Sequence, residues 1–284
     1  MESAVVRRVE SAGLALAVRE HTPWQAGKQS VILVHGYPDQ QDVWNPLVRF
    51  LPADQLHIVT YDVRGAGESD VPEHRSGYRT ALLVEDLLAV VAATVPDHGR
   101  FHLVGHDWGS VQLWDAVHAT STDDRLRNRV ASFTSISGPS LDHLAYLARH
   151  PGGRNRRLLE QAARSWYVAA FQLPLVPDLA WRLAGRWKPG LGRNGANGLG
   201  LYRANIGRRL RRPGTRTTDV PVQVIRPLRD RFIAAVAYED LHVTCSDVSV
   251  VDIDAGHWVI RTYAEQVAVL VTDHVRAHSA APPA

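Results

Sequence analysis

The sequence predicts an α/β fold with a mostly parallel sheet, helices on both faces and a helical insertion. Short apolar runs alternate with segments of helical periodicity up to about residue 138, as expected when parallel strands are joined by crossover helices. The alternation stops after Gly138-Pro139, and two further apolar runs come only after residue 219. We therefore predict core segments at 1–138 and 219–278, a helical lid at 139–218 and a tail at 279–284.

The individual elements follow from local patterns. Alternating apolar residues at 4–9 and 14–18 favour an opening hairpin. Strands are predicted from apolar runs at 31–34, 56–61, 101–104, 130–136, 220–225 and 248–253, the first three of them buried. Helical spacing of apolar residues predicts helices at 42–51, 79–92, 109–117 and about 263–277. Within the otherwise helical lid, the glycine-rich stretch 189–195 predicts a loop.

Composition and charge narrow the function classes. The 284 residues are 45% hydrophobic and 21% charged, with a net charge of +3, which is typical of a globular protein. Arginines gather between Arg149 and Arg216 but are interrupted by tryptophan and glycine, so we expect a solvated surface and no nucleic-acid partner. The single cysteine, Cys245, excludes an internal disulfide and argues against a thiolate metal site, and we expect no metal.

No stretch of the sequence predicts membrane insertion or secretion. The first residues lack the long apolar core of a signal peptide, and no uncharged run is long enough to cross a bilayer. We expect a cytoplasmic protein with no membrane partner, and we leave a homodimer open.

The pentapeptide Gly105-His106-Asp107-Trp108-Gly109 carries the most chemical information. It has the Gly-x-nucleophile-x-Gly form of a nucleophile elbow and lies between a predicted strand and a predicted helix. A serine at such an elbow attacks a carbonyl, whereas a carboxylate is suited to attack a saturated carbon and form an alkyl ester. Asp107 therefore favours hydrolysis of an epoxide or a carbon–halogen bond; the alternative is a solvated turn aspartate.

Four motifs in a fixed order carry a family resemblance: residues 35–38 (His-Gly-Tyr-Pro), residues 62–69, the elbow, and residues 254–258 around His257. The chain resembles α/β-hydrolases of the epoxide hydrolase and haloalkane dehalogenase group over roughly residues 13–277. It is most similar to the epoxide hydrolase branch, particularly actinobacterial hydrolase domains. The resemblance implies an α/β-hydrolase fold with eight strands and an inserted α-helical lid.

The resemblance and the chemistry together predict a catalytic triad. Hydrolysis of an alkyl ester needs an activated water, and histidine is the natural base near neutral pH. His257 follows the last strand, where the chain order of this fold puts the histidine. Asp230, after the preceding strand, is the expected acid that orients the imidazole. Asp142 is the alternative acid, and Asp230 could instead cap a helix.

The family pattern also predicts an oxyanion hole and substrate contacts. The backbone N–H groups of Tyr37 and Trp108 are expected to stabilise the charge that forms on the ester oxygen. His35 and Pro38 are expected to hold the loop around Tyr37. We also expect His35, Pro38, Trp108 and Trp166 to contact the substrate.

The leaving group decides between the two chemistries. Epoxide hydrolases of this family use two lid tyrosines to donate to the opening ring, and Tyr167 and Tyr202 lie in segments that resemble those motifs. We predict an epoxide hydrolase that needs no cofactor and acts on a small, apolar epoxide. The alternatives are a haloalkane or haloacid dehalogenase, in which Trp108 would bind halide, and a binding protein without turnover.

Overall fold

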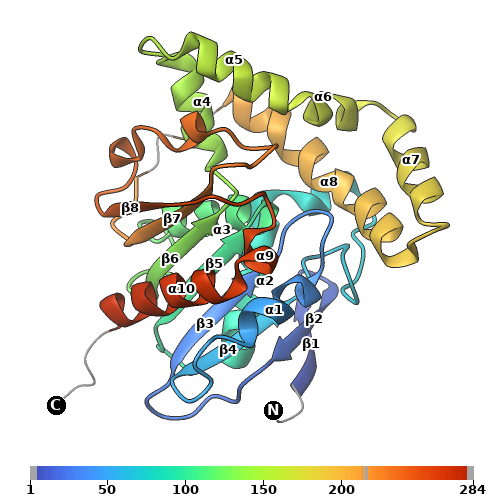
Figure 1. Ribbon diagram of the computed structural model, residues 1–284. Coiled ribbons are helices and arrows are strands. Elements are labelled where there is room, and N and C mark those ends of the chain that lie inside the picture. Colours follow the sequence, from blue (N-terminus) through green and yellow to red (C-terminus); the bar gives the residue numbers. More distant parts are fainter. Residues whose placement is uncertain (1–4, 213, 215–216, 280–284) are drawn as a thin grey trace.

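The computed structural model of the chain describes residues 5–212, 214 and 217–279 (Figure 1). Among these residues, eight strands form one sheet in the order β1-β2-β4-β3-β5-β6-β7-β8. The pairs β1–β2 and β2–β4 are antiparallel, and the remaining pairs are parallel. The predicted α/β fold with a mostly parallel sheet is confirmed. The strands are β1 Val5–Ser11, β2 Leu14–Glu20, β3 Gln29–Val34, β4 Leu56–Tyr61, β5 Phe101–His106, β6 Val130–Ile136, β7 Val222–Pro227 and β8 Val248–Ile253.

A few sequence-based expectations lie outside the described residues. They concern Ala4 at the start of the predicted hairpin, the tail after residue 279, and lid positions 213, 215 and 216.

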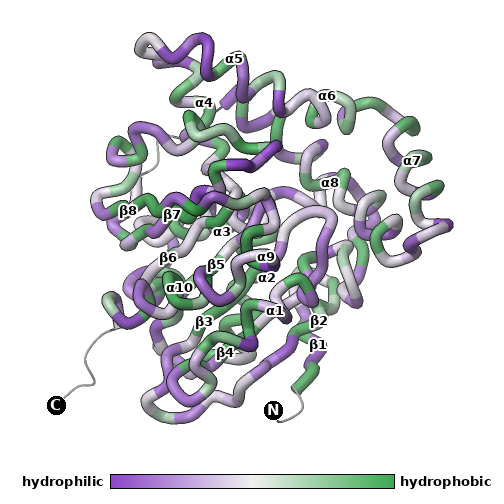
Figure 2. Tube along the Cα trace, in the orientation of Figure 1, coloured by the Kyte–Doolittle hydropathy of each residue, from purple (hydrophilic) through white to green (hydrophobic). Residues whose placement is uncertain are grey.

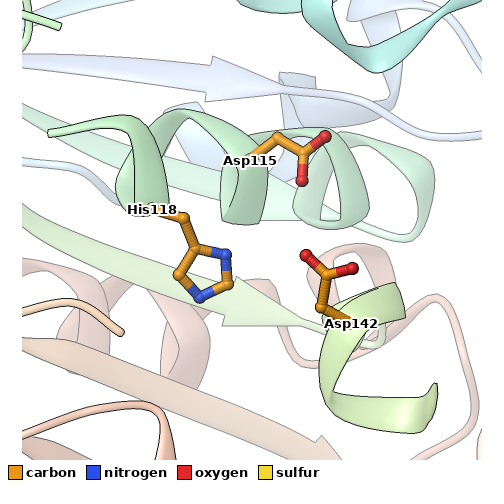
Figure 3. Close-up of side chains that lie close together, drawn as sticks. All are labelled: Asp115, His118 and Asp142. Atoms are coloured by element: carbon orange, nitrogen blue, oxygen red, sulfur yellow. The ribbon is translucent and has the colours of Figure 1, made fainter. Parts of the chain in front are cut away.

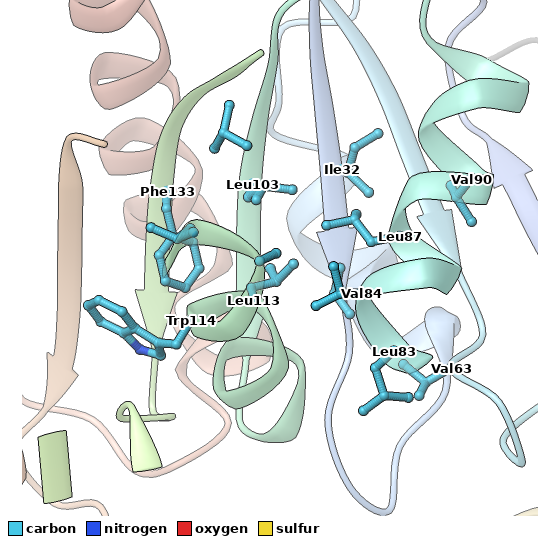
Figure 4. Close-up of a cluster of buried hydrophobic side chains, with 14 of the residues drawn as sticks. Ile32, Val63, Leu83, Val84, Leu87, Val90, Leu103, Leu113, Trp114 and Phe133 are labelled. Carbon is cyan, nitrogen blue, oxygen red and sulfur yellow. The ribbon is translucent and has the colours of Figure 1, made fainter. Parts of the chain in front are cut away.

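Successive residues of a strand face opposite sides of the sheet, which gives the fold two hydrophobic cores. On β3, Ile32 and Val34 belong to one core, and Val31 and Leu33 belong to the other. The first core contains side chains of α2 and α3, several of which appear in Figure 4, and the second contains side chains of α1 and α10. These helices are α1 Asn45–Val48, α2 Thr80–Thr94, α3 Trp108–Ala119 and α10 Ala264–His278.

Five helices between β6 and β7 lie over the carboxyl ends of the parallel strands, and we call them the lid (Figure 1). They are α4 Leu141–Arg149, α5 Asn155–Arg164, α6 Trp166–Gln172, α7 Val176–Ala184 and α8 Pro189–Arg211. The loop predicted at 189–195 is wrong, because these residues form the first turns of α8.

Close packing explains why so many glycines are found in α8. A Cβ atom on Gly198 would come within 2.5 Å of the Tyr37 ring, and one on Gly200 within 2.3 Å of the Tyr78 ring. Glycine is a poor helix former in isolation, but here tertiary contacts outweigh the intrinsic preference. The glycines let α8 approach the core closely enough to bring Tyr202 to the ends of the strands.

Short helical turns complete the fold. The helix predicted at 42–51 is instead a 3-10 turn, Gln41–Trp44, followed by the short α1, because Pro46 allows a helix to begin but not to pass through it. The remaining turns are Arg75–Tyr78, Ala235–Tyr238, Leu241–Val243 and α9 Val259–Thr262. Among the described helices, none combines the length and apolarity needed to cross a bilayer.

Candidate active site

Asp107 lies in the tight turn between β5 and α3, with φ 52° and ψ −124°. Such angles are uncommon for a residue with a side chain and persist only where the surroundings enforce them. A Cβ atom on Gly109 would lie 1.9 Å from the Val34 carbonyl oxygen, so only glycine lets α3 begin this close to β3. The turn projects the Asp107 carboxylate beyond the carboxyl end of β5, with 15% of the side chain exposed.

Three side chains from separate loops meet at this turn. His257 Nε2 lies 3.4 Å from Asp107 Oδ2, and His257 Nδ1 lies 2.9 Å from Asp230 Oδ2. The other oxygen of Asp230 accepts hydrogen bonds from the backbone N–H groups of Phe232 and Ile233, at 2.8 and 3.1 Å. The structure therefore brings the predicted nucleophile, base and acid into one chain of contacts, and it also gives Asp230 the capping bonds of the alternative interpretation.

The alternative acid, Asp142, occupies a different site. Its carboxylate accepts hydrogen bonds from Arg209 Nη1 and from the Gly214 N–H, both at 2.8 Å. Since His257 Nδ1 is bonded to Asp230, the geometry favours Asp230 as the orienting acid.

The charges of Asp107, His257 and Asp230 influence one another, and two pKa values are shifted. Burial alone would lower the pKa of His257, but hydrogen bonds and attraction from Asp107 and Asp230 outweigh it and raise the pKa to about 10. Burial would raise the pKa of Asp230, yet the His257 ring and the N–H groups of Phe232 and Ile233 lower it. In the free protein at neutral pH, His257 is therefore a cation held between two carboxylates.

Two backbone N–H groups are available beside Asp107. The Tyr37 N–H donates to Asp107 Oδ1 at 2.7 Å. Trp108 is the first residue of α3, where a backbone N–H has no partner within the helix. These are the two donors that the sequence predicted for an oxyanion hole.

The two predicted lid tyrosines lie together above Asp107. The ring centroids of Tyr167 and Tyr202 are 6.1 Å apart, and Tyr202 also contacts the rings of Tyr37 and Trp108 at 5.2 and 4.9 Å. Burial, and after it the negative charge of Asp107, raises the pKa of both phenols above the ordinary value. Both tyrosines are therefore neutral hydrogen-bond donors at working pH.

A cavity of about 530 Å³ separates the lid from the triad. Its wall includes the predicted site residues Tyr37, Pro38, Asp107, Trp166, Tyr167, Tyr202 and His257. Most of the remaining wall is aromatic or apolar, from Phe171, Trp181, Leu191, Phe232 and Trp258. Arg164 and Arg231 supply the positive charge of the wall.

Two expected substrate contacts need correction. His35 does not line this cavity; its ring is buried behind the loop, where Nε2 accepts the Val63 N–H at 2.9 Å and Nδ1 lies 2.9 Å from the Gly36 carbonyl oxygen. Trp108 does not line it either; its ring packs against the Tyr202 ring, with centroids 4.9 Å apart. Both side chains support residues that face the cavity.

The sequence did not predict the hydrogen bonds between the lid and the loop that carries Asp230. The buried side chain of Gln161 on α5 donates to the Phe232 carbonyl oxygen at 3.0 Å and accepts the Ala234 N–H at 2.6 Å. Arg164, on the same helix, donates to the Asp230 carbonyl oxygen at 2.6 Å. No local motif marks such residues, since their partners are about 70 positions away.

One cluster outside the cavity has the residue types of a metal site. Candidate ligand atoms of Asp115, His118 and Asp142 lie within 4.8 Å of one another (Figure 3). The Arg209 guanidinium, however, bonds to both carboxylates. A cation of the protein itself therefore neutralises them, and the cluster joins α8 to α3 and α4.

Residues 29–261 match a family described as the alpha/beta hydrolase fold. The chain belongs to the α/β-hydrolase fold family. Solved structures of similar shape include a Bacillus megaterium epoxide hydrolase in complex with an inhibitor (TM-score 0.75, 19% identity, covering 95% of this chain and 100% of that one). Another is epoxide hydrolase A from Mycobacterium thermoresistibile (TM-score 0.74, 21% identity, 98% and 100% covered). At such identities the likeness concerns the fold.

Among curated relatives, this α/β-hydrolase is 33% identical over 274 residues to the probable oxidoreductase EphD of Mycobacterium tuberculosis. That match covers 86% of this chain but 45% of the relative, so the chain spans less than half the length of that relative. It is 32% identical over 180 residues to epoxide hydrolase A of the same species, covering 63% of this chain and 51% of that protein. The resemblance to the epoxide hydrolase branch, with mycobacterial relatives, is confirmed.

Proposed function

We propose that the chain is an epoxide hydrolase that opens its substrate through a covalent ester on Asp107. One observation carries the proposal: an elbow carboxylate and two neutral phenols, Tyr167 and Tyr202, line the same cavity. A carboxylate can attack an oxirane carbon, and a phenol can donate to the oxygen that leaves. The aromatic wall favours a small, apolar epoxide.

In the first step, Asp107 Oδ2 attacks one carbon of the epoxide while the ring C–O bond breaks. Oδ2 is the suitable oxygen because Oδ1 is already held by the Tyr37 N–H. The oxygen of the opened ring takes a proton from Tyr167 or Tyr202. The products are a hydroxyalkyl ester on Asp107 and a phenolate.

Ester formation changes the charge around His257. The carboxylate of Asp107 is one of the two groups that raise the pKa of His257 to about 10. Once Asp107 is esterified its charge is gone, so the pKa of His257 falls and the imidazolium can release its proton to the phenolate. The histidine is then neutral, as a general base must be.

In the second step, neutral His257 takes a proton from water as the water oxygen attacks the ester carbon of Asp107. Negative charge develops on Oδ1 and is stabilised by the Tyr37 and Trp108 N–H groups. Collapse breaks the bond between the ester carbon and Oδ2, which leaves as an oxygen of the diol, and the second water proton goes to that oxygen. Asp107 is again a carboxylate and His257 again a cation, so the cycle closes without a cofactor.

The dehalogenase alternative has less support. A halide released at Asp107 would need N–H donors in the cavity, but the Trp108 ring packs against Tyr202 and does not line the cavity. No specific contact favours that function or a binding protein without turnover.

A single turnover in water enriched in heavy oxygen tests the covalent route. With enzyme in excess over an aromatic epoxide such as styrene oxide, we expect the first diol to carry mostly oxygen from Asp107, and label to enter the diol only in later turnovers. Solvent label at full level in the first diol would rule out the ester. Halide release from haloalkanes without diol from epoxides would favour the alternative.

A further inference from the structure

One face of the lid is apolar and cationic and has no cover among the described residues. It comprises α7 and the turns on either side of it, at the outer end of the lid (Figure 1). We call it the α7 face. Its exposed apolar side chains are Leu173, Leu175, Val176, Leu179, Leu183 and Trp187, of which Leu175 is 79% and Trp187 89% exposed.

Helical spacing explains how this face arises. Pro177 and Trp181 turn inward, and the Trp181 ring packs against Tyr37. Val176, Leu179 and Leu183 lie on the opposite side of the helix and point outward. Such residues normally form the buried stripe of a helix, so an outward stripe of leucine and valine indicates a surface that something else covers.

Three cations accompany the apolar residues. Arg182, Arg186 and Lys188 are exposed, and none of them forms an ion pair with another part of the described chain. Asp178, the single acid between residues 172 and 191, is bonded to Arg203. The α7 face thus carries a net positive charge. Figure 2 shows hydrophilic segments beside the hydrophobic ones of α7.

The α7 face also adjoins the opening of the active-site cavity. Leu191, just after the face, lines the cavity and is exposed to solvent. Trp166, on the helix before α7, also lines the cavity and is 71% exposed. A surface that covered the α7 face would therefore lie beside the route by which an apolar molecule reaches Asp107.

We propose that the α7 face docks on the surface of an anionic lipid bilayer and that the enzyme takes apolar epoxides dissolved in that bilayer. Leucine and tryptophan side chains would enter the region between headgroups and acyl chains, as in interfacial helices. The cations would lie among anionic headgroups, each strengthening binding. The part of this inference that concerns the substrate rests on the proposed epoxide hydrolase function.

Charge favours a bilayer over a second copy of the chain. Two α7 faces in contact would bring two sets of unpaired cations together, which is unfavourable without acids to pair them. Surface binding requires no membrane-spanning helix. The prediction that a membrane is not a partner rested on the lack of a spanning stretch, and it does not bear on this face.

Co-sedimentation with vesicles tests the docking. We expect the protein to sediment with vesicles of phosphatidylcholine and phosphatidylglycerol in equal amounts, and to stay in solution with phosphatidylcholine alone. The charge variant Arg182→Gln/Arg186→Gln/Lys188→Gln should weaken binding on the order of 100-fold, since each cation near an anionic surface contributes roughly fivefold. The apolar variant Leu175→Ser/Leu179→Ser/Trp187→Ser should also lose binding.

A matched control tests whether vesicle binding depends on the α7 face or on exposed apolar side chains anywhere on the molecule. The variant Phe50→Ser/Val269→Ser removes two half-exposed apolar side chains, from the turn after α1 and from α10, on the body of the molecule, and should bind vesicles like the wild type. The inference is overturned if the wild type stays in solution with anionic vesicles. It is also overturned if sedimentation velocity shows a dimer that the apolar variant dissociates.

Activity assays separate failure of this inference from failure of the proposed function. With a water-soluble epoxide, the apolar and charge variants should turn over like the wild type, because none of the changed residues lines the cavity. With a long-chain epoxide in anionic vesicles, the same variants should lose at least tenfold in rate. If the wild type binds vesicles but forms no diol, the proposed function fails and the docking stands. If the variants lose activity equally with both substrates, the inference is overturned.

Discussion

The core half and the lid half of the active site are held by different kinds of contact. In the core, Asp107, Asp230 and His257 follow β5, β7 and β8 and form short polar contacts with one another. In the lid, Tyr167 and Tyr202 are held by aromatic packing, and the helices are tied to the core by polar bonds from α5 and α8. In the mechanism we propose, the core makes and breaks the ester, and the lid controls ring opening and access.

Removing the core nucleophile should have the largest effect. Asp107→Ala leaves no carboxylate to form the ester, so we expect turnover to fall by about 10⁴-fold or more. Diol formation from a soluble epoxide is the measurement. The control is Asp254→Ala, an exposed carboxylate near His257 that pairs with Arg229. Near-normal activity of the Asp107 variant would disprove the covalent route.

Removing the core base should separate the two chemical steps. His257→Gln keeps the nucleophile and the lid tyrosines but cannot activate water, so we expect turnover to fall by about 10³-fold or more. The ester on Asp107 should then accumulate and appear in intact-protein mass spectra as an adduct of the substrate's mass. An inactive variant without adduct would mean that His257 is also needed for ring opening.

Changing the lid donors should slow ring opening and leave ester hydrolysis intact. Tyr202→Phe and Tyr167→Phe each remove one hydroxyl, and we expect each to slow ester formation by about 10²-fold. Rapid-quench measurement of adduct formation and decay reports the two steps separately. Tyr146→Phe, in a lid helix but off the cavity, is the matched control. A change in the decay step would contradict the division between core and lid.

The pH dependence of stability tests the charge state of the core. The pKa of His257 rises from 6.5 to about 10 on folding, so its protonation stabilises the fold fully below about pH 6.5. That stabilisation is lost as the pH rises through about 10. We expect Tm to fall across this window in the wild type and to fall less in His257→Gln. Parallel curves for the two proteins would show that the pKa of His257 is not raised.

Breaking one tie between the two halves should have the smallest effect. Gln161→Leu leaves the Phe232 carbonyl and the Ala234 N–H without their partner, at a cost of about 1–3 kcal/mol in the free energy of unfolding. Chemical denaturation measures it, with the exposed lid change Gln172→Leu as control. Because the tie holds the loop of Asp230, kcat should also fall several-fold; unchanged kcat would limit Gln161 to a stabilising role.

The sequence predicted the core half more completely than the lid half, for physical reasons. Asp107, Asp230 and His257 each follow a strand, and parallel strands bring their carboxyl ends to one edge, so position along the chain fixes position in space. The start of α8 was missed because its glycines favour a loop locally, whereas in the fold Gly192 and Gly195 pack closely against Gly185 and Trp181. His35 was placed in the cavity wrongly because a motif does not tell which way its ring turns. Gln161 was not predicted because its partners are distant in sequence.

The bonds from α5 to residues 230–234 have a consequence for building chimeras from this fold. A lid exchanged at its two junctions with the sheet would lose the partners of Gln161 and Arg164, although neither junction was disturbed. Arg154 would likewise lose Glu239. The transferable module is therefore discontinuous: a graft of α4–α8 should travel together with residues 228–240, which carry the acid of the triad.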